Sequence, residues 1–178
     1  MRYWKPIYIV LLLFIILITG CNSSTGPKPI ELTDGRFLAS VEGSDAFTGD
    51  AFFEISVPEN EWFPGEYEDP VLFLRLVTEE LKPANRPVEY VILVGILVNV
   101  LWDEESQALE IGNTVISNTF IDPRTYAMHD IKSGTIRLTE RTDGLLAGTV
   151  ELIIENSAGV EKELTGEFRA VPEEQQGT

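Results

Sequence analysis

The segment with the most side chains that could bind a ligand or a metal ion is the loop between Pro58 and Pro70, which combines carboxylates with aromatic rings. Carboxylate oxygens are ligands that Ca²⁺ prefers, although the loop lacks the Asp-x-Asp-x-Asp-Gly order of a calcium-binding loop. Aromatic faces beside carboxylates would alternatively bind a sugar through Trp62 and Tyr67. A third interpretation is a solvated acidic loop whose aromatic rings fold back on the core. The candidate metal ligands are Glu59, Glu61, Glu66, Glu68 and Asp69.

The chain carries few of the residue types that enzymes use, because His129 is its only histidine and Cys21 its only cysteine. A Ser-His-Asp arrangement would require His129, but no Gly-x-Ser-x-Gly segment accompanies it. A zinc site would need carboxylates for nearly all its other ligands. With 29 acidic residues, the sequence nominates no carboxylate pair for glycoside hydrolysis. No glycine-rich phosphate loop is present. We therefore expect no catalytic residue, no cofactor and no enzymatic activity.

Cys21 stands in a context that predicts its role. The basic residues Arg2 and Lys5 are followed by an unbroken apolar run of 12 residues, Ile7–Ile18. A membrane-spanning helix needs roughly 20 apolar residues, so this run has the length of a signal-peptide core. The alternative is an uncleaved anchor followed by an incidental cysteine. Both interpretations place the rest of the chain outside the cytoplasm.

The segment Ile18-Thr19-Gly20-Cys21 resembles the lipobox of bacterial lipoproteins: an aliphatic residue, a small residue, glycine or alanine, then cysteine. The resemblance implies that the Cys21 thiol is joined to a diacylglycerol, that the preceding peptide is removed, and that the new amino terminus is acylated, for example with palmitate. Two or more acyl chains hold a protein firmly to a membrane. In this family Asp after the cysteine favours the inner membrane. Asn22 stands here, which implies the outer membrane where the cell has one.

Composition narrows the choice of partners and of fold. The formal charge of −16 argues against nucleic acid and anionic lipid headgroups as partners. One cysteine leaves none for a disulfide, so the fold must be held by its core. We expect four segments: a signal peptide (1–20), a lipidated cysteine and flexible tether (21–30), one all-β domain (31–172) and a disordered tail (173–178).

Short alternating stretches bounded by turn residues run through the domain, and no long amphipathic helical pattern interrupts them. The last third is clearest, because Thr142-Asp143-Gly144 and Asn156–Gly159 join three stretches that are apolar on one face and polar on the other. Asp-Gly supplies the positive φ that a tight turn needs. The predicted strands are 36–41, 46–56, 71–78, 88–102 with a bend at Gly95, 108–111, 114–116, 134–141, 145–155 and 160–171. The fold is therefore predicted to be all-β, an antiparallel β-sandwich or a small β-barrel of about eight strands after a signal helix.

Two segments, Val71–Leu76 and Tyr90–Trp102, are apolar on both faces of the expected strands. In a sandwich, a loop or a partner must cover one such face. In a barrel, the inner face would line a cavity for an apolar ligand, contributed by Val91, Leu93 and Leu97. A third interpretation is that both segments are simply central strands. The Gly-x-Trp pattern of lipocalins is absent near the first strand.

The body of the chain resembles small all-β lipoprotein domains of unknown function, in pattern and not in any diagnostic motif. This resemblance implies no chemistry. Our main expectation is a membrane-anchored lipoprotein with a non-enzymatic binding or structural role in the cell envelope, whose partner is an envelope protein or a glycan. The alternative is a lipocalin-like carrier of a small apolar ligand. An envelope hydrolase ranks third, because it would require a cleft with His129 or a close carboxylate pair.

Overall fold

The computed structural model describes residues 31–57, 69–81, 92–112 and 118–173. The chain divides after residue 31 into two compact units, and every strand described below belongs to the second, Leu32–Thr178. The predicted signal helix and tether lie outside the described residues, as do residues 174–178 of the predicted tail. The described part contains strands and turns but no helix, which confirms the all-β prediction.

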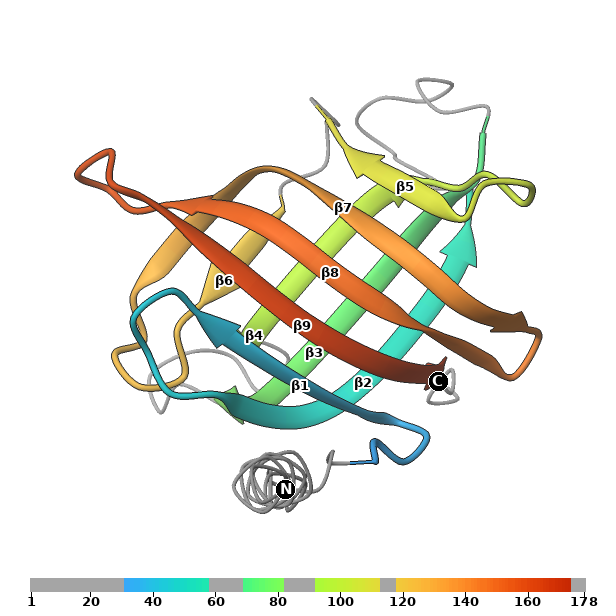
Figure 1. Cartoon of the computed structure of the whole chain (residues 1–178), viewed down its shortest axis with the longest axis horizontal. Helices are drawn as coiled ribbons and strands as arrows, with labels where there is room; N and C mark the ends of the chain where they lie inside the picture. Colours follow the sequence, from blue (N-terminus) through green and yellow to red (C-terminus); the bar gives the residue numbers. More distant parts are fainter. Residues whose placement is uncertain (1–30, 58–68, 82–91, 113–117, 174–178) are drawn as a thin grey trace, which may run out of the picture. The chain divides into compact units, whose positions relative to one another are not determined.

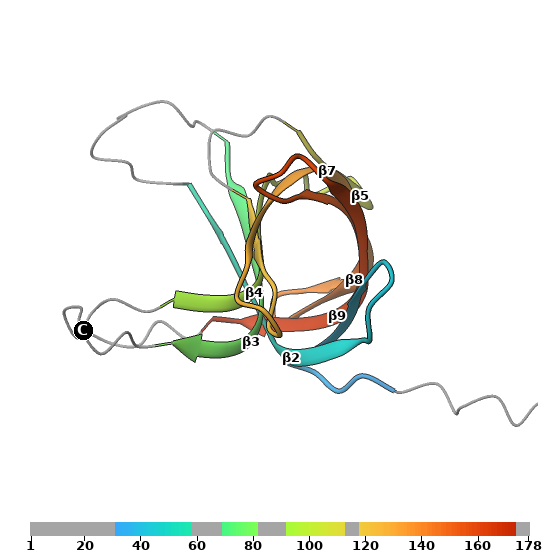
Figure 2. The same ribbon diagram turned by 90° about the vertical axis from the view of Figure 1, so that its left-hand side faces the viewer.

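Nine strands form one sheet that closes into a ring (Figures 1 and 2). Strands follow one another around the ring as antiparallel neighbours, and β9 pairs with β1 to close it. Both β5 and β6 pair with β7 and occupy the same place in the ring, so the fold is an eight-stranded antiparallel barrel. Of the two predicted alternatives, the barrel is therefore correct and the sandwich is not. The strands are β1 (Arg36–Val41), β2 (Phe47–Ser56), β3 (Val71–Leu81), β4 (Ile92–Leu101), β5 (Ala108–Ile111), β6 (Thr119–Ile121), β7 (Met128–Thr142), β8 (Leu145–Glu155) and β9 (Glu161–Pro172).

An insertion splits the strand position that β5 and β6 share. Ile111 of β5 lies opposite Gly134 of β7, and Thr119 of β6 lies opposite Asp130 of the same strand. Ile111 and Thr119 are eight positions apart in the chain, whereas the β7 residues opposite them, Gly134 and Asp130, are only four positions apart. β6 also pairs with β4, but β4 and β5 share no hydrogen-bonded ladder. A hollow of about 370 Å³ opens beside them, lined in part by Leu101, Ser106, Ala108, Glu110 and Gly112.

The core lies inside the barrel, where alternate residues of all nine strands form one cluster of 24 buried hydrophobic side chains. Each buried leucine or phenylalanine stabilises the fold by about 1.5–3 kcal/mol relative to an exposed one. The inward faces predicted from alternation are confirmed on β1, β7, β8 and β9, and on β2 except near its end, where Ile55 was expected on the inward face but is 37% exposed. These inward residues include Phe37, Ala39, Val41, Ala51, Phe53, Ile136, Leu138, Leu146, Val150, Leu152, Ile154, Leu164, Phe168 and Ala170.

Glycine stands where the wall of the barrel bends. Gly95, predicted as a bend, has φ +139° and lies opposite Val77, next to a β-bulge in β3. Gly134 has φ +153°, and a Cβ atom there would lie 2.4 Å from the Glu151 carbonyl oxygen on β8. Residues that have a Cβ atom rarely adopt these backbone φ values, so both bends require glycine.

The structure corrects the strand and turn predictions, and one correction is that β3 ends at Leu81 instead of residue 78. β6 was not predicted, and β7 begins at Met128 instead of Gly134, because a bulge at Lys132 breaks the two-residue period of its first half. The Asp143-Gly144 turn joins β7 to β8 as predicted, but Gly144 is not among the glycines with positive φ, so that part of the reasoning is wrong. The predicted strand 114–116 and residues 88–91 lie outside the described residues.

Candidate binding surface

One half of the barrel carries polar side chains on its outer surface. On β1, β7, β8 and β9, outward residues of neighbouring strands form rows of mainly charged and hydroxyl groups, which we call the polar wall. Its two central rows, read across β1, β9, β8 and β7, are Leu38, Glu167, Thr149 and Arg137, then Ser40, Thr165, Glu151 and Thr135.

The opposite half is mostly apolar on its outer surface as well as inside, and its polar outward residues are Arg75, Asn99 and Thr119. Leu72, Leu74 and Leu76 of β3 belong to the core, so the residues between them face outward, and β4 repeats this arrangement. Two of the outward residues are buried, most are half-buried, and Leu101 is 49% exposed. We call this surface the apolar wall, formed by Phe52, Val71, Phe73, Val77, Leu97, Leu101 and Ile121.

One charged side chain, Arg75, lies in the middle of the apolar wall, between Phe52 and Leu97 on the neighbouring strands. Its guanidinium forms an ion pair with the carboxylate of Glu173. The Glu173 backbone N–H donates a 2.9 Å hydrogen bond to the Phe53 carbonyl, which holds this carboxylate beside β2. The ion pair leaves the centre of the wall without net charge.

Exposed carboxylates border the apolar wall on three sides. Glu54 lies on the β2 side, Asp130 on the β7 side, and Glu79 and Glu80 at the end of β3. Within the described part of the chain, none of these four carboxylates has a cationic partner. The wall therefore has a neutral, mostly apolar centre, in which Asn99 and Thr119 are the uncharged polar residues beside Leu97, and an acidic border.

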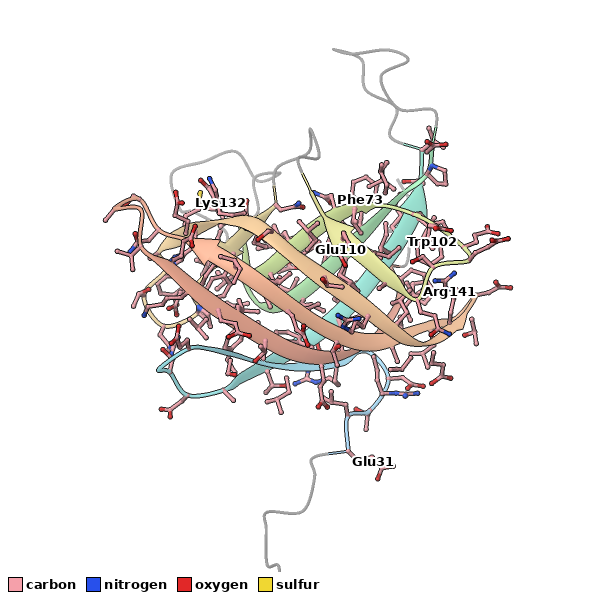
Figure 3. All side chains as sticks on the ribbon, turned by 45° about the horizontal axis from the view of Figure 1, so that its top comes forward. Glu31, Phe73, Trp102, Glu110, Lys132 and Arg141 are labelled. Carbon is pink, nitrogen blue, oxygen red and sulfur yellow. The ribbon has the colours of Figure 1, made fainter. Side chains whose placement is uncertain are left out.

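The end of the barrel where β4 leads into β5 is closed by Arg141 of β7. Its guanidinium donates hydrogen bonds to the backbone carbonyls of Asp103, Glu104 and Ser106. It also lies over the Trp102 ring, 4.5 Å from the ring centroid, and Figure 3 shows the two side chains at the same end of the barrel. A single side chain thus fixes the acidic segment 103–105, because the planar guanidinium serves several acceptors at once.

His129 lies at the other end of the barrel, in an aromatic stack. Its ring centroid is 5.5 Å from that of Phe120, which stacks in turn on Phe47 at 5.9 Å. Within the described part of the chain, the His129 side chain makes no hydrogen bond to a serine or a carboxylate. The arrangement packs the imidazole against Phe120 of the core.

Three titratable groups have shifted pKa values. Burial acts to raise the pKa of Asp122, but hydrogen bonds and attraction from Arg124 outweigh it and leave the pKa below its ordinary value of 3.8. The carboxylate of Glu79 raises the pKa of Tyr126 by charge and by accepting its hydroxyl hydrogen bond. The hydrogen bond to Asp34 at 2.7 Å is the main cause of the raised pKa of Arg169. All three groups lie in surface ion pairs or hydrogen bonds. These contacts account for the pKa shifts, so the shifts do not by themselves mark a functional site.

The sequence-predicted site residues lie, with the exception of Asp69, outside the part of the chain that the structure describes. Cys21, Glu59, Glu61, Trp62, Glu66, Tyr67 and Glu68 lie outside the described residues, and Asp69 is exposed where β3 is about to begin. Among the residues that are described, no three of the His, Cys, Asp and Glu type gather closely enough for a metal ion. Leu97, expected to line an internal cavity, instead faces outward, because Ile96 and Val98 fill the core.

The sequence predicted only part of the apolar wall, namely the part formed by β3 and β4. The double-sided apolar character of Val71–Leu76 and Tyr90–Trp102 was the signal, but the wall also includes Phe52 and Ile121, which carry no such signal. Ile121 belongs to β6, the strand that the sequence did not predict. Its place beside Gly95 follows only from the pairing of β4 with β6.

Comparison with known proteins found no relative of this chain. No protein-family profile matches the chain, and neither the curated proteins nor the solved structures contain a significant match. No membrane-crossing helix is found among the residues that the structure describes.

Proposed function

We propose that the protein is a lipid-anchored extracytoplasmic lipoprotein of the bacterial cell envelope, and that its barrel is a non-enzymatic binding module that contacts a partner through the apolar wall. The observation that carries the binding role is the contrast between the two walls. Contiguous apolar side chains on the outside of a domain mark interaction surfaces, because their burial against a partner removes apolar area from water. The polar wall carries charged and hydroxyl side chains at equivalent outward positions, so the barrel fold itself does not require an apolar outer surface.

The anchoring role rests on the leader and on Ile18-Thr19-Gly20-Cys21. Cleavage before Cys21 would place Arg36, where β1 begins, 15 positions after the lipidated residue. An extended chain of that length spans at most about 50 Å. The start of β1 would therefore lie within about that distance of the membrane, which is the outer membrane in a cell that has two.

Site-specific cross-linking in living cells tests the binding role. A photoreactive amino acid replaces Leu101 of the apolar wall, and in a matched strain it replaces Ile153, a half-buried residue that faces outward on β8 of the polar wall. We expect a discrete cross-linked product from position 101 and none from position 153. Equal products from both positions, or none from either, would contradict the binding role.

Labelling with palmitate tests the anchoring role separately. We expect the label to enter the wild-type protein and not Cys21→Ala, and the variant to leave the membrane fraction. Incorporation into both proteins, or into neither, would remove the anchor from the proposal and leave the cross-linking result standing.

A further inference from the structure

We propose that the partner presents a cationic amphipathic helix to the apolar wall, an inference that rests on the function proposed above. The face of the wall presents side chains, because β2, β3 and β4 are hydrogen-bonded to one another across it and β6 pairs with Gly95–Leu97 of β4. A partner that lies on this face must therefore be recognised through side-chain contacts and not by strand addition, which takes place in the plane of the sheet.

The dimensions of the wall fit one helix. Four strands spaced about 4.8 Å apart make a surface about 15 Å wide. Four rows of outward residues, from Val71 and Leu101 at one end to Val77 and Ile121 at the other, extend it to about 20 Å along the strands. An α-helix with side chains is about 10–12 Å across and rises 1.5 Å per residue, so about 14 helical residues cover this surface.

Charge sets the chemistry of the helix. Arg75 in the centre is neutralised by Glu173, so the contacting face of the helix should be apolar. The border carboxylates Glu54, Glu79 and Asp130 lack cationic partners within the described part of the chain, so the flanks of the helix should carry lysine or arginine. A second copy of this chain would instead bring its own acidic border and a charge of −16, and like charges would oppose the contact.

Designed peptides provide the test. The full chain is placed through its lipid anchor in nanodiscs of uncharged phosphatidylcholine, and binding of a fluorescent peptide of about 14 residues is measured by anisotropy against empty nanodiscs. One peptide has leucine on one helical face and lysine on the flanks. The second has the same pattern with glutamate in place of lysine. We expect the lysine peptide to bind, more weakly as salt rises, and the glutamate peptide not to bind.

Variants locate the binding on the wall. Leu97→Ser should weaken the lysine peptide about tenfold, since a buried leucine contact is lost, whereas Ile153→Ser on the polar wall should leave it unchanged. Leu101→Ser, at a more exposed position, replaces Leu97→Ser if circular dichroism shows that the latter is unfolded. Combined Glu54→Gln, Glu79→Gln and Asp130→Asn changes should weaken binding and flatten its salt dependence.

The outcomes separate the two proposals. Equal weakening by Leu97→Ser and Ile153→Ser, or equal binding of both peptides, would overturn the cationic-helix proposal. If position 101 cross-links in cells but neither peptide binds, the helix proposal is wrong and the binding role stands. If position 101 does not cross-link and no peptide binds, the binding role itself fails.

Discussion

Replacing Gly134 by alanine should lower the free energy of unfolding by about 3 kcal/mol. The residue has φ +153°, where an L-residue pays about 1–3 kcal/mol of backbone strain. The new Cβ atom would also lie 2.4 Å from the Glu151 carbonyl oxygen and 2.8 Å from Leu152 Cδ2. The carbonyl belongs to the ladder between β7 and β8, and Leu152 is fully buried, so neither atom can move away freely. Such overpacking costs about 1–3 kcal/mol.

Equilibrium unfolding in urea, followed by far-ultraviolet circular dichroism, measures the effect. Gly112→Ala is the matched control, because no heavy atom lies within 4 Å of its added Cβ and its φ is not positive. We expect the control to change the free energy of unfolding by less than about 1 kcal/mol. If Gly134→Ala proves as stable as Gly112→Ala, the account of how the barrel bends at β7 is incorrect.

Two further changes probe the ends of the barrel. Arg141→Lys should lower the free energy of unfolding by about 1–2 kcal/mol, because lysine keeps a charge beside Trp102 but replaces the two guanidinium nitrogens that reach the three carbonyls with a single ammonium nitrogen. An equal loss in the exposed polar-wall variant Arg137→Lys would contradict this. Asp122 has a lowered pKa in the folded protein, so its ionised form stabilises the fold fully above pH 3.8 and this contribution falls as pH drops through the folded value. The stability advantage of wild type over Asp122→Asn should accordingly be constant near neutral pH and shrink in strong acid, and urea unfolding between pH 2 and pH 7 that shows a constant difference throughout would refute the assignment.

The sequence predicted the positions of those strands that have one buried face and one solvent-exposed face. β1, β5 and β8 begin and end at the predicted residues, because alternation and turn residues define them locally. β6 was missed because three residues are too few to show a period, and the start of β7 was missed because a bulge interrupts its alternation. Barrel closure was not predictable, since it depends on the pairing of β1 with β9 and not on any local pattern.

The candidate surface was harder to predict than the strands. Alternation marks a strand that is apolar on one face, but β3 and β4 are apolar on both, so the sequence did not reveal which face is inside. Leu97 was assigned to the interior for that reason, whereas the register with Arg75 and Thr119 places it outside. The border carboxylates were not recognised either, because Glu54 and Asp130 come together around one surface only after the barrel forms.

Closure of the ring has a consequence for the time course of folding. Asp34 and Arg169, which form an ion pair beside the β1–β9 seam, are 135 positions apart in the chain. A hydrogen-bonded seam between such distant segments carries a large loop-closure entropy, so it forms late and slowly. Until β9 arrives, β1 has one unpaired edge with backbone groups that another chain can occupy. We therefore expect a partly formed barrel in which β9 has not yet paired with β1 to be the species most prone to aggregation during folding.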